Sequence, residues 1–148
     1  MIKTVYADID ATMYERSSSM NTGIDSILEL SKISSSAGIF TSRILIKFPL
    51  TEISSSVASG KISNPTFFLN LYQTKTDEVP TEYNLVAYPV SQSWVQGTGR
   101  TLEPTNLNSL TREGVSWIYR NKLHPGTERI VSKDIEWTSQ SLATNSNM

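Results

Sequence analysis

Apolar and polar residues alternate in several short stretches of this chain, and loop-forming residues separate the stretches. Near the N-terminus every second residue is apolar, which predicts one long strand or two short ones with a polar face: Val5, Ala7, Ile9, Ala11, Met13. Residues 43–48 predict another strand, with Ile44, Ile46 and Phe48 on one face. On the other face, Arg43 and Lys47 can lay their stems along apolar surface. Residues 66–73 predict a further strand, with Phe67, Leu69 and Leu71 pointing inward.

The stretch from Tyr83 to Arg120 organises the second half of the chain. Apolar residues occupy both parities of residues 85–90, which is typical of a strand covered on both faces. Trp94 and Trp117 are each large enough to fill much of a small core. We therefore expect one shared core, built from Phe48, Leu69, Leu71, Val86, Trp94 and Trp117.

Weaker patterns complete the expected element list. Residues 27–32 predict a short strand, although a single helical turn fits them too, and residues 50–53 predict a turn or short helix. Residues 114–120 and 130–137 are the last strand candidates. Segments rich in Ser, Asn and Gly are predicted loops between them: residues 17–23, 34–38 and 54–60.

Short strands separated by such loops predict an all-β fold, an antiparallel β-sandwich of the jelly-roll kind. We expect one domain over residues 1–137 and a polar tail or linker over residues 138–148. No internal repeat or amphipathic helix is apparent. The strands that would finish the second sheet are missing after Trp137, so we expect the sandwich to be incomplete at its C-terminal end. A continuation of the chain or another subunit would complete it.

Composition narrows the possible partners. The 148 residues include 13 basic and 14 acidic side chains, which gives no electrostatic footprint for duplex nucleic acid and no polybasic membrane patch. No window reaches the roughly 18 consecutive apolar residues of a membrane helix, and Asp8 interrupts the apolar run that a signal peptide needs. The chain has no cysteine, so disulfides and thiolate metal sites are not available.

A search for reactive groups finds little that supports catalysis. His124 is the sole histidine and lies beside Pro125 and Gly126, without a nucleophile elbow. Asp8 and Asp10 share a strand face, which fits a solvated surface, a glycosidase pair, or a cation site with Asp25 or Asn21. Residues 97–99 resemble a fragment of a phosphate loop but are better interpreted as a turn. We expect no enzymatic activity, cofactor or metal.

Aromatic side chains are the remaining candidates for a functional surface. Exposed rings can stack on sugars or bases, or anchor a protein interface. The candidate ligand or interface aromatics are Tyr14, Tyr88, Trp94 and Tyr119.

The order of several segments resembles the DNRLRE-type β-sandwich domain. The segments are Asn21-Thr-Gly23, the motif from Arg43 to Leu50, the alternating leucines of residues 68–72, and a valine-rich strand running into Trp94 and then Val115-Ser-Trp117. The resemblance covers residues 5–137. The chain departs from the family pattern at Pro49, where Asp is usual, and at Thr22, where an aromatic residue is common.

The resemblance implies a non-enzymatic function. Some members of this family are related to carbohydrate-binding modules, whereas the long polar loops and the phrase from Tyr88 to Gly97 look more like versions in virion proteins of tailed bacteriophages. We therefore expect a structural component of a phage particle, in the capsid decoration, tail or fibre, assembled in the host cytoplasm. Its partners would be other virion proteins or copies of itself. The alternative is a carbohydrate-binding module that docks glycan on aromatic side chains.

Overall fold

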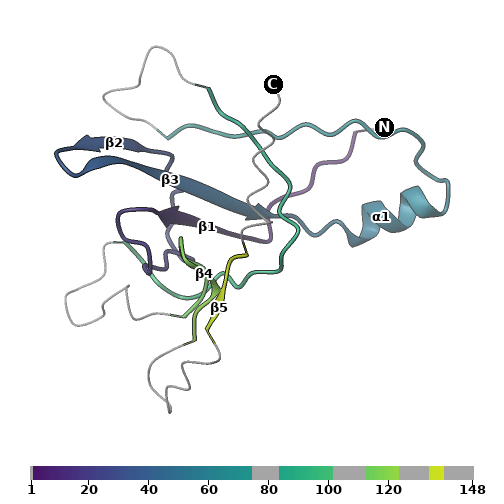
Figure 1. The fold of residues 1–148 in the computed structure, drawn as a ribbon. Coiled ribbons are helices and arrows are strands. Elements are labelled where there is room, and N and C mark those ends of the chain that lie inside the picture. Colours follow the sequence, from purple (N-terminus) through teal and green to yellow (C-terminus); the bar gives the residue numbers. More distant parts are fainter. Residues whose placement is uncertain (1, 75–83, 102–112, 124–133, 139–148) are drawn as a thin grey trace.

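A computed structural model describes residues 2–74, 84–101, 113–123 and 134–138 of the chain. Its elements are antiparallel strands with one short helix, so the expected mainly-β fold is confirmed at this level (Figure 1). In chain order they are β1 (Ile9–Tyr14), β2 (Lys32–Ser35), β3 (Gly38–Lys47), α1 (Thr51–Ala58), β4 (Tyr119–Asn121) and β5 (Ile135–Glu136).

The larger sheet has three strands in the order β1-β3-β2. The long strand β3 pairs with β1 through its C-terminal part and with β2 through its first residues. In this register Ala11 lies opposite Leu45 and Met13 lies opposite Arg43. Side chains of directly opposed residues share one face of a sheet. Ala11, Met13 and Leu45 therefore lie on the same face, and all three are buried. The strand expected over residues 43–48 is thus confirmed and begins five residues earlier. Its expected inward face is wrong, because the buried residue is Leu45 and not Ile44, Ile46 or Phe48.

The core is small and lies against this face of the sheet. It consists of Ala11, Met13, Leu45 and Val115, with three half-buried tryptophans packed against it: Trp94, Trp117 and Trp137. The guanidinium carbon of Arg43 lies 4.4 Å from the centroid of the Trp117 ring, which is a cation–π contact. The core expected from the sequence is right for Trp94 and Trp117. It is wrong for Leu69, Leu71 and Val86, which are exposed, and for Phe48, which is half-buried and not part of the core cluster.

The second half of the chain forms a tight hairpin and a two-stranded sheet. Gly114 and Lys122 face each other across the hairpin, and the Ser116 amide donates to the Tyr119 carbonyl at 2.7 Å. β4 then pairs with β5, and the Trp137 indole donates to the Ser116 carbonyl at 2.9 Å. The single strand expected over residues 114–120 is therefore a turn between two paired arms of a hairpin. Of the last expected strand, residues 130–133 lie outside the described residues.

Two other expectations are corrected by the structure. Residues 27–31 form no strand; β2 instead includes Ser34 and Ser35, where a loop was expected. Gly38 has a φ of 127°, a conformation that glycine adopts without strain, so it closes a hairpin between β2 and β3. Residues 54–58, expected as loop, continue the helix α1.

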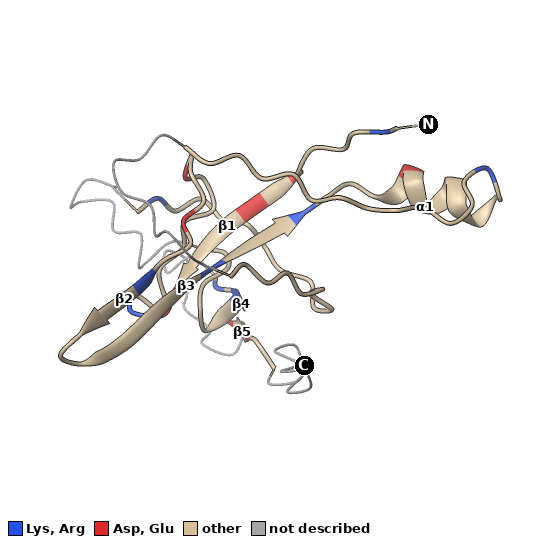
Figure 2. Ribbon diagram, turned by 90° about the horizontal axis from the view of Figure 1, so that it is seen from above, with Lys and Arg blue, Asp and Glu red and all other residues tan. Residues whose placement is uncertain are grey.

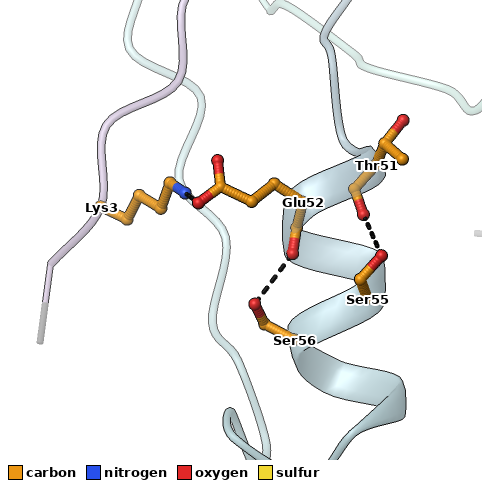
Figure 3. A network of polar contacts seen from close by, with 5 residues as sticks. All are labelled: Lys3, Thr51, Glu52, Ser55 and Ser56. Carbon is orange, nitrogen blue, oxygen red and sulfur yellow. Dashed lines mark hydrogen bonds and ion pairs between the residues drawn. The ribbon is translucent and has the colours of Figure 1, made fainter.

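α1 and the N-terminal segment extend together beyond the end of β3, away from the sheets (Figures 1 and 2). None of the helix residues is buried. The hydroxyl groups of Ser55 and Ser56 donate hydrogen bonds to the backbone carbonyls of Thr51 and Glu52. Lys3 forms an ion pair with Glu52 at 2.5 Å (Figure 3). An exposed pair of this kind contributes little to stability.

Candidate functional site

Asn21 is the polar centre of the molecule. Its side chain is fully buried, and its amide nitrogen donates to the carbonyls of Gln96 and Val115 at 2.7 and 2.8 Å. Its side-chain oxygen accepts from the amides of Gly23 and Gly99 at 3.2 and 2.7 Å. All hydrogen-bonding capacity of the group is used, as a buried amide requires. One residue of a predicted loop therefore joins segments that are 75 and more positions apart.

Three glycines leave the space that the Asn21 side chain fills. A Cβ on Gly97 would lie 2.5 Å from the Asn21 side-chain oxygen, and one on Gly114 would lie 2.7 Å from its nitrogen. A Cβ on Gly99 would lie 2.2 Å from the Asn21 carbonyl oxygen. Only glycine fits such close backbone approaches. We call Asn21 with Gly97, Gly99 and Gly114 the Asn21 node. Residues 97–99, expected as a turn, are part of it.

Thr22 extends this node to the edge of β1. Its hydroxyl donates to the Thr12 carbonyl at 2.6 Å and accepts from the Thr12 amide at 3.1 Å. Both threonines are buried. The side chain thus replaces a neighbouring strand at this point of the edge, and buried backbone groups that would otherwise need a partner are satisfied.

A partly exposed polar cluster lies beside the node. The Tyr14 hydroxyl donates to Glu29 at 2.9 Å, and Asp25 accepts from the amide and the hydroxyl of Thr101. Burial raises the pKa of Tyr14 to about 12, and the hydrogen bond and negative charge of Glu29 add to this shift. The tyrosine therefore keeps its proton and holds the loop around residue 29 against β1.

The structure does not gather the four nominated aromatics into one site. Tyr14 is half-buried on β1, and Trp94 packs against the core. Tyr119 is half-buried on β4. Tyr88 is the one ring of the four that is largely exposed, at 65%. Only Tyr88 is therefore placed as a ligand-stacking or interface ring would be.

The residues nominated for a cation or for glycosidase chemistry also have other roles. Asn21 is saturated by backbone groups, and Asp25 binds Thr101. Burial raises the pKa of Asp10, while Asp8 is exposed. Within the described part of the chain, no three acidic or histidine side chains lie close enough to hold a metal ion. His124 lies outside the described residues.

Two extended segments form the most unusual surface of the molecule. Every residue of 63–74, the first arm, and of 84–91, the second arm, is exposed. The first arm runs back from α1 above the three-stranded sheet. The second arm runs in the opposite direction and then turns towards β4 (Figure 1). No backbone–backbone hydrogen bond among the described residues involves either arm. The strands expected at residues 66–73 and 85–90 are thus extended but unpaired, and their expected burial is wrong.

The arms are rich in large apolar side chains and have no charge. Their exposed apolar residues are Phe67, Phe68, Leu69, Leu71, Tyr72, Leu85, Val86, Tyr88 and Val90. Neither arm contains Asp, Glu, Lys or Arg, so both are free of red and blue in Figure 2. Proteins commonly protect exposed strand edges with charges or proline; the arms have no charge and one proline each, Pro65 and Pro89. An apolar surface of this size marks an interaction site. The alternation of apolar residues in the sequence indicated these segments, but we interpreted their apolar side chains as part of the core.

Comparisons with known proteins add no family or relative. No family model, no curated protein and no solved structure matches the chain. In the described part of the chain, no helix is long and apolar enough to cross a membrane.

Proposed function

We propose that this protein is a non-enzymatic structural subunit that is built into a larger particle through protein contacts. The observation that supports this function is the pair of exposed, unpaired and uncharged arms. Extended segments of this kind bind by adding a strand to a partner, where main-chain hydrogen bonds give affinity and alternate side chains give specificity. The proposed fold is an antiparallel sandwich of the jelly-roll kind that is completed when the arms are covered.

The particle that we propose is a bacteriophage virion, and the protein would be a capsid decoration, tail or fibre component. This part of the proposal rests on the sequence resemblance to virion versions of the DNRLRE-type domain. The exposed arms agree with it, because a subunit that functions only inside an assembly can carry apolar surface that a free protein would have to hide.

Glycan binding is the second candidate, and the exposed rings favour it. Phe68, Tyr72 and Tyr88 are 83%, 94% and 65% exposed, and such rings stack on the apolar faces of sugars. A sugar site also needs fixed polar donors beside the rings, whereas neither arm is held in place by hydrogen bonds to other described residues. We therefore rank assembly first.

The deciding experiment follows the protein in its native source through a density gradient. We expect it to sediment with particles at a fixed stoichiometry, and a variant with Phe68→Ser and Tyr72→Ser to remain in the soluble fraction. A matched variant in α1, Ser54→Ala, should enter particles normally because Ser54 is an exposed residue away from the arms. Retention of the wild-type protein on a polysaccharide column, with no particle association, would support glycan binding instead.

A further inference from the structure

The first arm has the properties of a strand that pairs with its own copy. We infer that residues 66–73 of two copies of this chain pair antiparallel about a two-fold axis. This inference rests on the proposed function, since it names one partner for the same surface. Three observations support the inference: the side-chain pattern of the arm, its lack of charge and its exposed area.

The side-chain pattern of the arm is compatible with self-pairing in one favoured register. When the axis passes through Asn70, Phe68 lies opposite Tyr72 of the partner subunit, and Leu69 lies opposite Leu71 of the partner subunit. Aromatic and apolar pairs of this kind stabilise antiparallel sheets. A shift of the axis to Leu69 would instead place Phe68 opposite Asn70 of the partner subunit. The pattern therefore selects Asn70 as the central residue, and a two-fold contact uses the same patch on both copies.

The charge of the arm permits this contact. Like charges opposite each other would oppose pairing of identical strands, and the arm has no charged residue. The whole chain has a net charge of −1, so long-range repulsion between copies is weak. An arm meant to stay single would be expected to carry the lysines that protect natural strand edges.

The exposed area of the arm sets the size of the contact. Phe67, Phe68 and Tyr72 are 67%, 83% and 94% exposed, which at ~200 Å² for an aromatic side chain leaves about 500 Å² per copy. The exposed area of these rings sums to about 1,000 Å² in two copies, and edge-to-edge pairing covers only the parts that face the partner strand. Specific protein interfaces begin at about 1,200 Å² in total. Pairing of the arms alone therefore gives a contact at the small end of this range, which fits a dimer that forms only at higher protein concentration.

The absence of cysteine makes a direct test possible. In the 148-residue chain carrying Asn70→Cys, position 70 is the only thiol. Directly opposed residues of an antiparallel pair have Cβ atoms about 4.5–5.5 Å apart, close to the separation in a disulfide. We expect mild oxidation to give a disulfide-linked dimer. Ser36→Cys, on the exposed turn between β2 and β3, should stay monomeric under the same conditions.

Sedimentation of the unmodified chain provides the second measurement. We expect a concentration-dependent dimer that Leu71→Lys abolishes and that Ser54→Lys, an equal charge change on exposed α1, leaves intact. Leu71 is exposed, so both variants should melt like the unmodified protein when all three are compared at concentrations too low for dimers, because dimer formation itself raises the melting temperature. A monomer at all concentrations, a dimer that survives Leu71→Lys, or equal cross-linking through Ser36→Cys would overturn the inference. A monomeric chain that still enters particles would refute the pairing of copies and leave the proposed function standing.

Discussion

Gly97 and Gly60 offer a matched pair of substitutions that tests how tightly the Asn21 node is built. Both residues have positive φ, 81° and 72° respectively, so alanine meets similar backbone strain at each. Their surroundings differ. A Cβ on Gly60 would meet nothing within 4 Å, whereas one on Gly97 would lie 2.2 Å from the Glu113 carbonyl oxygen and 2.5 Å from the Asn21 side-chain oxygen.

The difference in crowding sets the expected magnitudes. Gly60→Ala should cost about 1 kcal/mol, the penalty of left-handed backbone for a residue with a Cβ. Gly97→Ala must in addition displace Asn21 or the backbone at Glu113. If two of the four Asn21 hydrogen bonds are lost in the fully buried site, the additional cost is roughly 2–6 kcal/mol. A total of about 3–7 kcal/mol is a large share of the 5–15 kcal/mol that stabilises a typical domain.

Equilibrium unfolding in urea, followed by tryptophan fluorescence, measures both costs. Trp94, Trp117 and Trp137 all pack against the core, so their emission reports its loss. The comparison of interest is the difference in unfolding free energy between the two variants. Equal losses within about 0.5 kcal/mol, the usual scatter for neutral sites, would show that the chain around Gly97 yields easily. The Asn21 node would then not be the rigid centre of the molecule.

Three further variants probe the same region. Asn21→Asp keeps the shape but replaces the donor to the Gln96 and Val115 carbonyls with an acceptor, so we expect a loss of about 3–5 kcal/mol; an unchanged melting temperature would contradict it. The pKa of Tyr14 is raised from 10.0 to about 12, so between these pH values the folded chain keeps a proton that the unfolded chain releases. The resulting stabilisation of the folded state is fully present below pH 10 and is lost as the pH rises towards 12. Tyr14→Phe should remove this alkaline loss from urea titrations, and an unchanged pH dependence would exclude Tyr14 as its source. Trp94→Ala should cost about 3–5 kcal/mol, and a loss below about 1 kcal/mol would place the ring at the surface.

Local alternation predicted β1 and β3 as strands, but it gave the wrong inward face for β3, where Leu45 is buried and Ile44, Ile46 and Phe48 are only half-buried. Ala11 and Met13 share a parity in the sequence and a face in the sheet. The same rule failed for residues 66–73. Alternation shows that one side of a strand needs cover, but it does not say whether the cover comes from the same chain. Leu69 and Leu71 satisfy the pattern and are still half exposed.

The Asn21 node could not be predicted from local sequence. Asn21 and Gly23 are residues typical of a loop, and their positions next to serines predict solvent exposure. The contacts that bury Asn21 come from residues 96, 99 and 115, which only the tertiary structure brings together. The glycines Gly97, Gly99 and Gly114 were the one feature of the sequence that indicated a close backbone approach in this region. Two of them have positive φ, and all three are closely approached both by backbone atoms and by the side chain of Asn21.

The node and the arms make stability and association separable in this chain. The node connects residues 21–23 to residues 96–99 and 115, and its hydrogen bonds involve no residue of 63–74 or 84–91. A substitution in the node should therefore lower the unfolding free energy of a single chain without a direct effect on the surface offered to partners. A substitution in the first arm should do the reverse, because Phe68 and Tyr72 are more than four-fifths exposed and removing an exposed side chain has little effect on folding. An arm variant that destabilised the isolated chain would show that the arm already packs on its own body, and the argument for an external partner would fail with it.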